Sequence, residues 1–191
     1  MERVVYILAV LLFSSCIGIK TDIEVKRDLS GTARLVYTVS QELLDSGTLD
    51  GNENWPVIPV GKADFERTAA RINGLELRSY HERKQGGDRL FEVALAFDHV
   101  SALSAFLGDN GQQFVYKTEN GSHVFTVLFN NKPEGGQPQT YDDALSSLVR
   151  TAFTGYQFDF SISVPGDEKT YTALMADLLT SAQAEMLEIR F

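Results

Sequence analysis

Cys16, the only cysteine in the chain, is the residue whose type and position most clearly predict chemistry. It follows Ser14, Ser15 and an unbroken apolar run over residues 4–13, and the run itself follows Glu2 and Arg3. This order is typical of a secretory signal peptide that ends at a lipid-attachment cysteine. The run is about half of the ~20 residues that a membrane-spanning helix needs. We therefore expect cleavage before Cys16 and acylation of its thiol.

Two residues of this segment depart from the usual bacterial lipobox. Phe13 stands three residues before the cysteine, where Leu is usual, and Ser15 stands directly before it in place of Gly or Ala. Looser, spirochaete-type lipoboxes accept both residues. Two alternatives stay open: an ordinary signal peptide cut near Ser15 with Cys16 incidental, or an uncleaved anchor.

The other residue types that carry chemistry form no recognisable pattern. His81, His99 and His123 lack the spacing of a zinc site, so we expect surface histidines and no metal or other cofactor. The chain has no Gly-x-Ser-x-Gly elbow and no phosphate-binding loop. Asp142 and Asp143 are expected at the start of a helix, where carboxylates favour the helix dipole. The sequence thus predicts a protein that is not an enzyme.

One loop carries apolar residues that could bind a ligand. Residues 47–62 are rich in Gly, Asn and Pro, which predicts a loop without regular structure. Within it lie an aromatic and three aliphatic residues: Trp55, Val57, Ile58 and Val60. They could form the lip of an apolar groove that accepts an acyl chain. The alternative is that the loop folds down and completes the core.

Composition limits the partners of the chain. It has 191 residues, 43% of them hydrophobic, which is enough for one sizeable core. The net charge of −9 without a basic stripe argues against nucleic acid and against electrostatic docking on anionic lipid. Membrane attachment would therefore depend on the lipid at Cys16, on an apolar surface, or on both.

Alternating apolar and polar residues predict an α+β domain, an antiparallel sheet of hairpins with two or three helices packed on one face. The expected division is a signal peptide at 1–15, a lipidated tether at 16–22 and a single domain at 23–191. Residues 173–187 also fit one amphipathic helix, although the alternation near the end favours a strand. Strands are expected near 23–29, 33–39, 75–83, 89–97, 114–118, 124–129, 156–164, 170–175 and 185–191, and helices near 64–73, 98–107 and 140–154.

Two stretches resemble the LppM-like bacterial lipoproteins. The hairpin IEVKRDLSGTARLVYTVS, just after the lipobox, is similar to the opening of that family's domain. FDFSISVPGD and the following YTALMADLLTSAQAEMLEIRF are similar to its end. The resemblance implies a lipid-anchored α+β envelope domain (LppM domain) that binds lipid or glycolipid, with no catalytic residues. Many members have a transmembrane helix after the domain; here none is expected, which leaves Cys16 as the anchor.

These observations predict an exported, non-enzymatic lipoprotein of the bacterial envelope, on the periplasmic or outer surface of a membrane. Its expected ligand is a lipid or glycolipid held in an apolar groove. The alternative is a structural or protein-interaction lipoprotein of the cell envelope, whose protein partner the sequence does not identify.

Overall fold

The computed structural model describes residues 17–40, 61–109, 113–129, 155–180 and 185–191. The α+β class is confirmed in outline, with strands forming most of the described chain. The elements are β1 (Ile17–Val25), β2 (Gly31–Ser40), α3 (Lys62–Arg71), β3 (Leu75–Gln85), β4 (Asp88–Phe97), α4 (Val100–Asp109), β5 (Gln113–Glu119), β6 (Ser122–Phe129), β7 (Gln157–Val164), β8 (Asp167–Leu174), α6 (Met175–Thr180) and β9 (Glu185–Arg190).

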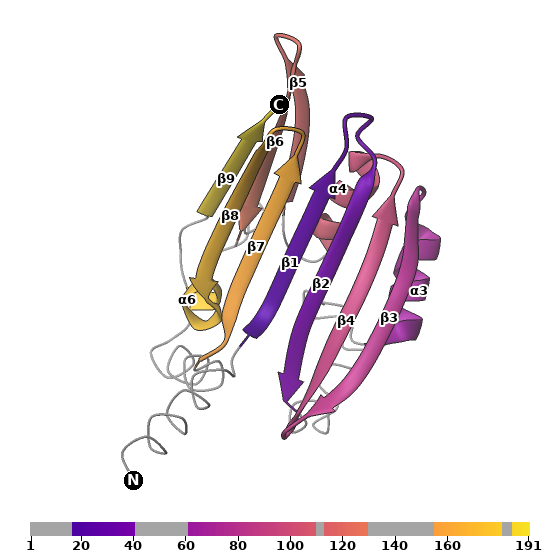
Figure 1. The fold of residues 1–191 in the computed structure, drawn as a ribbon, viewed down its shortest axis with the longest axis vertical. Helices are drawn as coiled ribbons and strands as arrows, with labels where there is room; N and C mark the ends of the chain where they lie inside the picture. Colours follow the sequence, from indigo (N-terminus) through magenta and orange to yellow (C-terminus); the bar gives the residue numbers. More distant parts are fainter. Residues whose placement is uncertain (1–16, 41–60, 110–112, 130–154, 181–184) are drawn as a thin grey trace, which may run out of the picture.

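The strands form two sheets, where the sequence predicted one. The larger sheet has six strands in the order β3-β4-β2-β1-β7-β8, and the smaller has three in the order β5-β6-β9 (Figure 1). The predicted antiparallel hairpins β1–β2, β3–β4 and β5–β6 are all present, and β7 and β8, predicted as separate strands, form a fourth. The β1–β7 pair is parallel, however, so the larger sheet is mixed. The alternation of apolar and polar residues along a strand indicates which face of the strand is buried. It does not indicate which other strand pairs with it.

The hairpin turns follow local sequence chemistry. Asn120 (φ 52°) and Gly121 (φ 81°) are both left-handed, as a two-residue turn between β5 and β6 requires. At the β1–β2 turn, Asp28 accepts hydrogen bonds from the backbone amide (3.0 Å) and the hydroxyl (2.7 Å) of Ser30. These bonds hold the pKa of Asp28 below its usual value.

A second layer covers one face of the larger sheet. Figure 1 shows α3 and α4 behind β2, β3 and β4, and the smaller sheet behind β7 and β8. The expectation that helices pack on one face is thus confirmed for α3 and α4, but the smaller sheet shares that layer. The core between the layers is continuous and aromatic. It includes Tyr37, Phe65, Phe91, Phe106, Phe125, Phe129, Phe158 and Phe160.

Two expectations need correction, and others concern residues that the structure does not describe. β1 begins at Ile17, so residues 17–22 belong to the sheet and are not a tether. Within this stretch Thr21 is buried, with 4% exposure. It pairs with Leu35 of β2 on one side and with Phe160 of β7 on the other. The single-helix interpretation of 173–187 is wrong, since β8, α6 and β9 divide that stretch.

The helix expected over 140–154 lies outside the described residues, as do Trp55, Val57, Ile58 and Val60.

Candidate functional site

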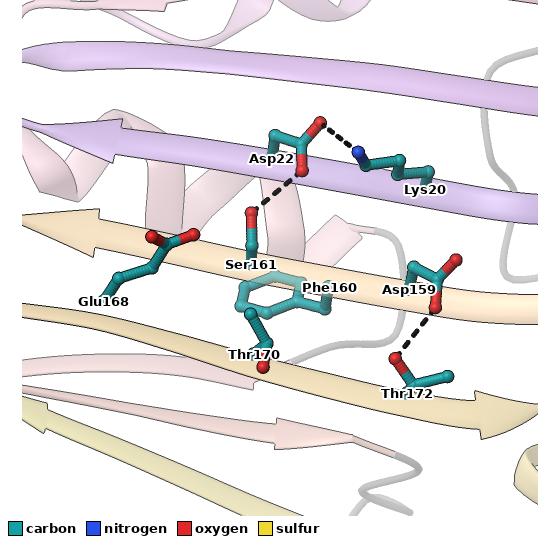
Figure 2. A pocket seen from close by; sticks show the side chains of 8 residues that line it. All are labelled: Lys20, Asp22, Asp159, Phe160, Ser161, Glu168, Thr170 and Thr172. Atoms are coloured by element: carbon teal, nitrogen blue, oxygen red, sulfur yellow. Dashed lines mark hydrogen bonds and ion pairs between the residues drawn. The ribbon is translucent and has the colours of Figure 1, made fainter.

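The outer face of the larger sheet has a hollow where β1, β7 and β8 lie side by side (Figure 2). Successive side chains of a strand point to opposite faces, so the apolar residues of these strands enter the core and their polar residues face outward. The hollow has a volume of about 370 Å³. It is lined by Lys20, Asp22, Asp159, Phe160, Ser161, Glu168, Thr170 and Thr172.

Strand register sets the outward side chains in rows across the hollow. One row runs from Lys20 through Asp159 to Thr172, because these residues are register partners on β1, β7 and β8. The next row runs from Asp22 through Ser161 to Thr170. Ser161 and Thr170 are short, whereas Lys20 and Glu168 at the border are long. The hollow is therefore a gap between long side chains.

Hydrogen bonds fix both carboxylates of these rows. The Ser161 hydroxyl donates to Asp22 Oδ1 at 2.8 Å, and the Thr172 hydroxyl donates to Asp159 Oδ1 at 2.8 Å (Figure 2). Lys20 Nζ lies 3.3 Å from Asp22 Oδ2. With side chains 46% and 36% exposed, that ion pair contributes at most about 1 kcal/mol. The bonds orient the carboxylates more than they stabilise the fold.

Most side chains that line this hollow are polar or charged. Three carboxylates, three hydroxyls and one ammonium group line it, and its apolar member, Phe160, is 1% exposed. Such groups donate and accept hydrogen bonds, as the hydroxyl groups of a ligand would require. Within the described ranges, no group of three or more His, Cys, Asp or Glu residues could hold a metal ion.

His99 and His123, which the sequence predicted to be surface histidines, are half-buried and both contact Tyr116. The His123 Nδ1 atom lies 2.8 Å from the Tyr116 hydroxyl and 3.4 Å from the Thr118 hydroxyl, while His99 packs edge-on against the Tyr116 ring. Both hydroxyls lie near Nδ1 of His123, and among the described residues no group hydrogen-bonds its Nε2 atom, as the base of a nucleophile–base pair would require. His123 also packs on Phe191, which fits a structural role. His81 is exposed.

Sequence reasoning did not identify the hollow. Asp159 and Ser161 were recognisable as outward positions of a half-buried strand, but their meeting with Lys20 and Asp22 depends on the β1–β7 pairing. No local signal encodes that pairing. Conversely, the predicted lipidation residue Cys16 and the predicted apolar loop lie outside the described residues.

The described residues form a two-layer α+β domain with a shallow hollow, lined mostly by polar side chains, on its outer sheet face. No family model matches the chain, and no curated protein matches it either. Among solved structures, the chain is similar to the folded domain of the LppM protein of Mycobacterium tuberculosis, determined by NMR. The match covers 91% of this chain and 88% of the other, with a TM-score of 0.47 and 7% identity. It concerns the fold alone and shows neither a shared family nor a shared function.

Proposed function

We propose that the chain is a non-enzymatic, membrane-anchored lipoprotein of the bacterial envelope, attached through acyl chains on Cys16. The observation that carries this proposal is the position at which the fold begins. β1 starts at Ile17, directly after Cys16, and pairs on both sides within the larger sheet. Cleavage before Cys16 would therefore leave every described strand in place, because the predicted leader ends where the sheet starts.

The chemistry of the leader supports the same conclusion. The apolar run over residues 4–13 has the length of a signal-peptide core and is too short to span a bilayer. In the part of the chain that the structure describes, no helix is long and apolar enough to cross a membrane. Two or three acyl chains on Cys16 would anchor the domain firmly, whereas a single chain holds only marginally.

We further propose a glycolipid as the ligand, bound through its polar head group. The hollow between β1, β7 and β8 supports this choice, because its oriented carboxylates and hydroxyls match the hydroxyl groups of a sugar. Trp55, Val57, Ile58 and Val60, the apolar loop residues singled out from the sequence, are the proposed site for an acyl chain.

Mass spectrometry of the N-terminus of the native protein tests the anchor. A mature chain that starts at a diacylated or triacylated Cys16 is the expected result. A free N-terminus at any other residue, or an unmodified Cys16, would refute the proposal, since the domain would then have no lipid attachment at this position.

A further inference from the structure

We propose that the end of the larger sheet where β1 begins rests on the membrane surface, with Leu174 at the lipid interface. This inference rests on the proposed acylation of Cys16 and specifies which surface of the domain meets the bilayer.

Only one peptide bond separates Cys16, the proposed anchor, from the first residue of β1. Ile17 follows Cys16 directly, and adjacent Cα atoms are about 3.8 Å apart. Ile17 already pairs with Gln157 of β7, and Ile19 pairs with Tyr37 of β2. β1 thus pairs with β7 from Ile17, across a register shift between Ile17 and Ile19, and with β2 from Ile19, so no linker of more than a residue or two separates the sheet from the acylated residue. This short connection holds the end of β1 close to the bilayer surface.

Strand register identifies the residues of β7 and β8 that lie at the same end as Ile17. Ile17 pairs with Gln157, and Gln157 pairs with Leu174. With neighbouring strands about 4.8 Å apart, Leu174 lies roughly 10 Å from Ile17. Figure 1 shows the start of β1, the start of β7 and α6 at the same end of the larger sheet, whereas the smaller sheet extends toward the opposite end.

β8 changes from charged residues to apolar ones toward this end. It begins with Asp167, Glu168 and Lys169, all exposed, and ends with Leu174, an apolar side chain that is 50% exposed. A single exposed leucine is unremarkable on a protein surface. Here it occupies the register row of the residue next to the anchor, where insertion into the interface would bury it.

This orientation also sets the height of the hollow above the membrane. Thr172 and Thr170 lie on the same face as Leu174, two and four residues before it. At about 3.4 Å per residue, they lie roughly 7 and 14 Å from the level of Leu174. The hollow would then open beside the head groups of lipids in the same membrane.

Depth-dependent fluorescence quenching tests the orientation in the full-length lipoprotein. Leu174→Cys and its matched control Asp167→Cys place one thiol at either end of β8. Acylation blocks Cys16, so a nitrobenzoxadiazole label reacts with the introduced thiol alone. In phosphatidylcholine vesicles that contain spin-labelled lipid, we expect quenching at position 174 to exceed that at position 167 severalfold. Equal quenching, or stronger quenching at 167, would overturn the inference.

Mass spectrometry of the same samples separates the two proposals. If Cys16 is acylated and position 174 is not preferentially quenched, the orientation is wrong and the proposed anchor stands. If Cys16 carries no lipid, the proposed function fails and the orientation fails with it.

Discussion

Phe129 of β6 stacks on Tyr171 of β8, with ring centroids 4.6 Å apart and ring planes inclined by 9°. The same Phe129 ring meets Phe158 and Phe160 of β7 edge-on, at 5.4 and 5.1 Å. One side chain of the smaller sheet thus contacts two strands of the larger one, and it is 1% exposed. We infer that the two sheets depend on this contact for their alignment.

Phe129→Ala should lower the free energy of unfolding by about 3–5 kcal/mol, because it removes a buried ring and leaves a cavity between the sheets. Urea unfolding followed by circular dichroism measures the loss. Met186→Ala is the matched control: Met186 is 66% exposed, so its truncation should change the unfolding free energy by less than about 0.5 kcal/mol. Similar losses in both variants would contradict the assigned role of Phe129.

Gly31→Ala should destabilise the domain by at least about 2 kcal/mol, because the added Cβ would overlap the Glu24 carbonyl oxygen and the Phe97 ring. The carbonyl belongs to the paired β1 strand and cannot rotate away. Gly87→Ala in the β3–β4 turn is the control, since its Cβ would meet nothing within 4 Å. Thermal unfolding should give a clearly lower melting temperature for Gly31→Ala than for Gly87→Ala. Equal melting temperatures would count against the close approach of β1 and β2 at Gly31.

Alkaline pH should destabilise the fold through Tyr37, a buried side chain with 2% exposure. Burial raises the pKa of Tyr37 well above its usual value near about 10. The folded state holds this proton more tightly than the unfolded chain does. The contribution of Tyr37 to the free energy of unfolding is therefore complete below about pH 10. Above that pH it declines, by up to about 1.4 kcal/mol per pH unit.

Tyr37→Phe should accordingly flatten the fall of unfolding free energy between about pH 10 and 12, as measured by urea titrations at several pH values. Burial and the neighbouring Glu82 carboxylate also raise the pKa of Tyr80, to about 12. Tyr80→Phe should flatten the curve less, because Tyr80 is more exposed than Tyr37. Identical slopes in wild type and Tyr37→Phe would show that other groups cause the alkaline loss.

Cys16→Ser should release a folded domain from the membrane fraction, since the proposed acyl chains attach at that thiol. Fractionation of cells and immunoblotting measure the release, and circular dichroism of the released protein should match that of the detergent-solubilised wild type. Ser15→Ala, which restores a small residue usual before the cysteine, should leave the protein in the membrane fraction. Retention of the Cys16→Ser protein would mean that another surface holds it.

Asp159→Ala should weaken glycolipid binding about tenfold, a loss of about 1.4 kcal/mol, because it removes an oriented acceptor from the hollow. Flotation of the protein with glycolipid-containing vesicles measures this, using Cys16→Ser as the background so that the anchor does not mask the effect. Asp167→Ala, at the far end of β8 and outside the hollow lining, is the control. Undiminished binding by the Asp159 variant would exclude the hollow as the head-group site.

The sequence predicted the described hairpins because each is encoded within about twenty consecutive residues. Asn120 and Gly121 specify their turn, and the alternation in β7 and β9 assigns the buried faces correctly. The division into two sheets, the parallel β1–β7 pair and the rows of the hollow were not predictable. They depend on contacts such as the one between Asp22 and Ser161, which are 139 positions apart in the chain. Long-range pairing of this kind has no local signature.

The parallel β1–β7 pair also has a consequence for when the protein folds. β1 finds one of its two partners only in residues 157–164, so most of the chain must be present before the larger sheet can close. Until then β1 exposes an unpaired edge directly beside Cys16. Nascent chains would stay partly folded until roughly their last fifth is present, and a chaperone that shields such edges would raise the yield of folded protein.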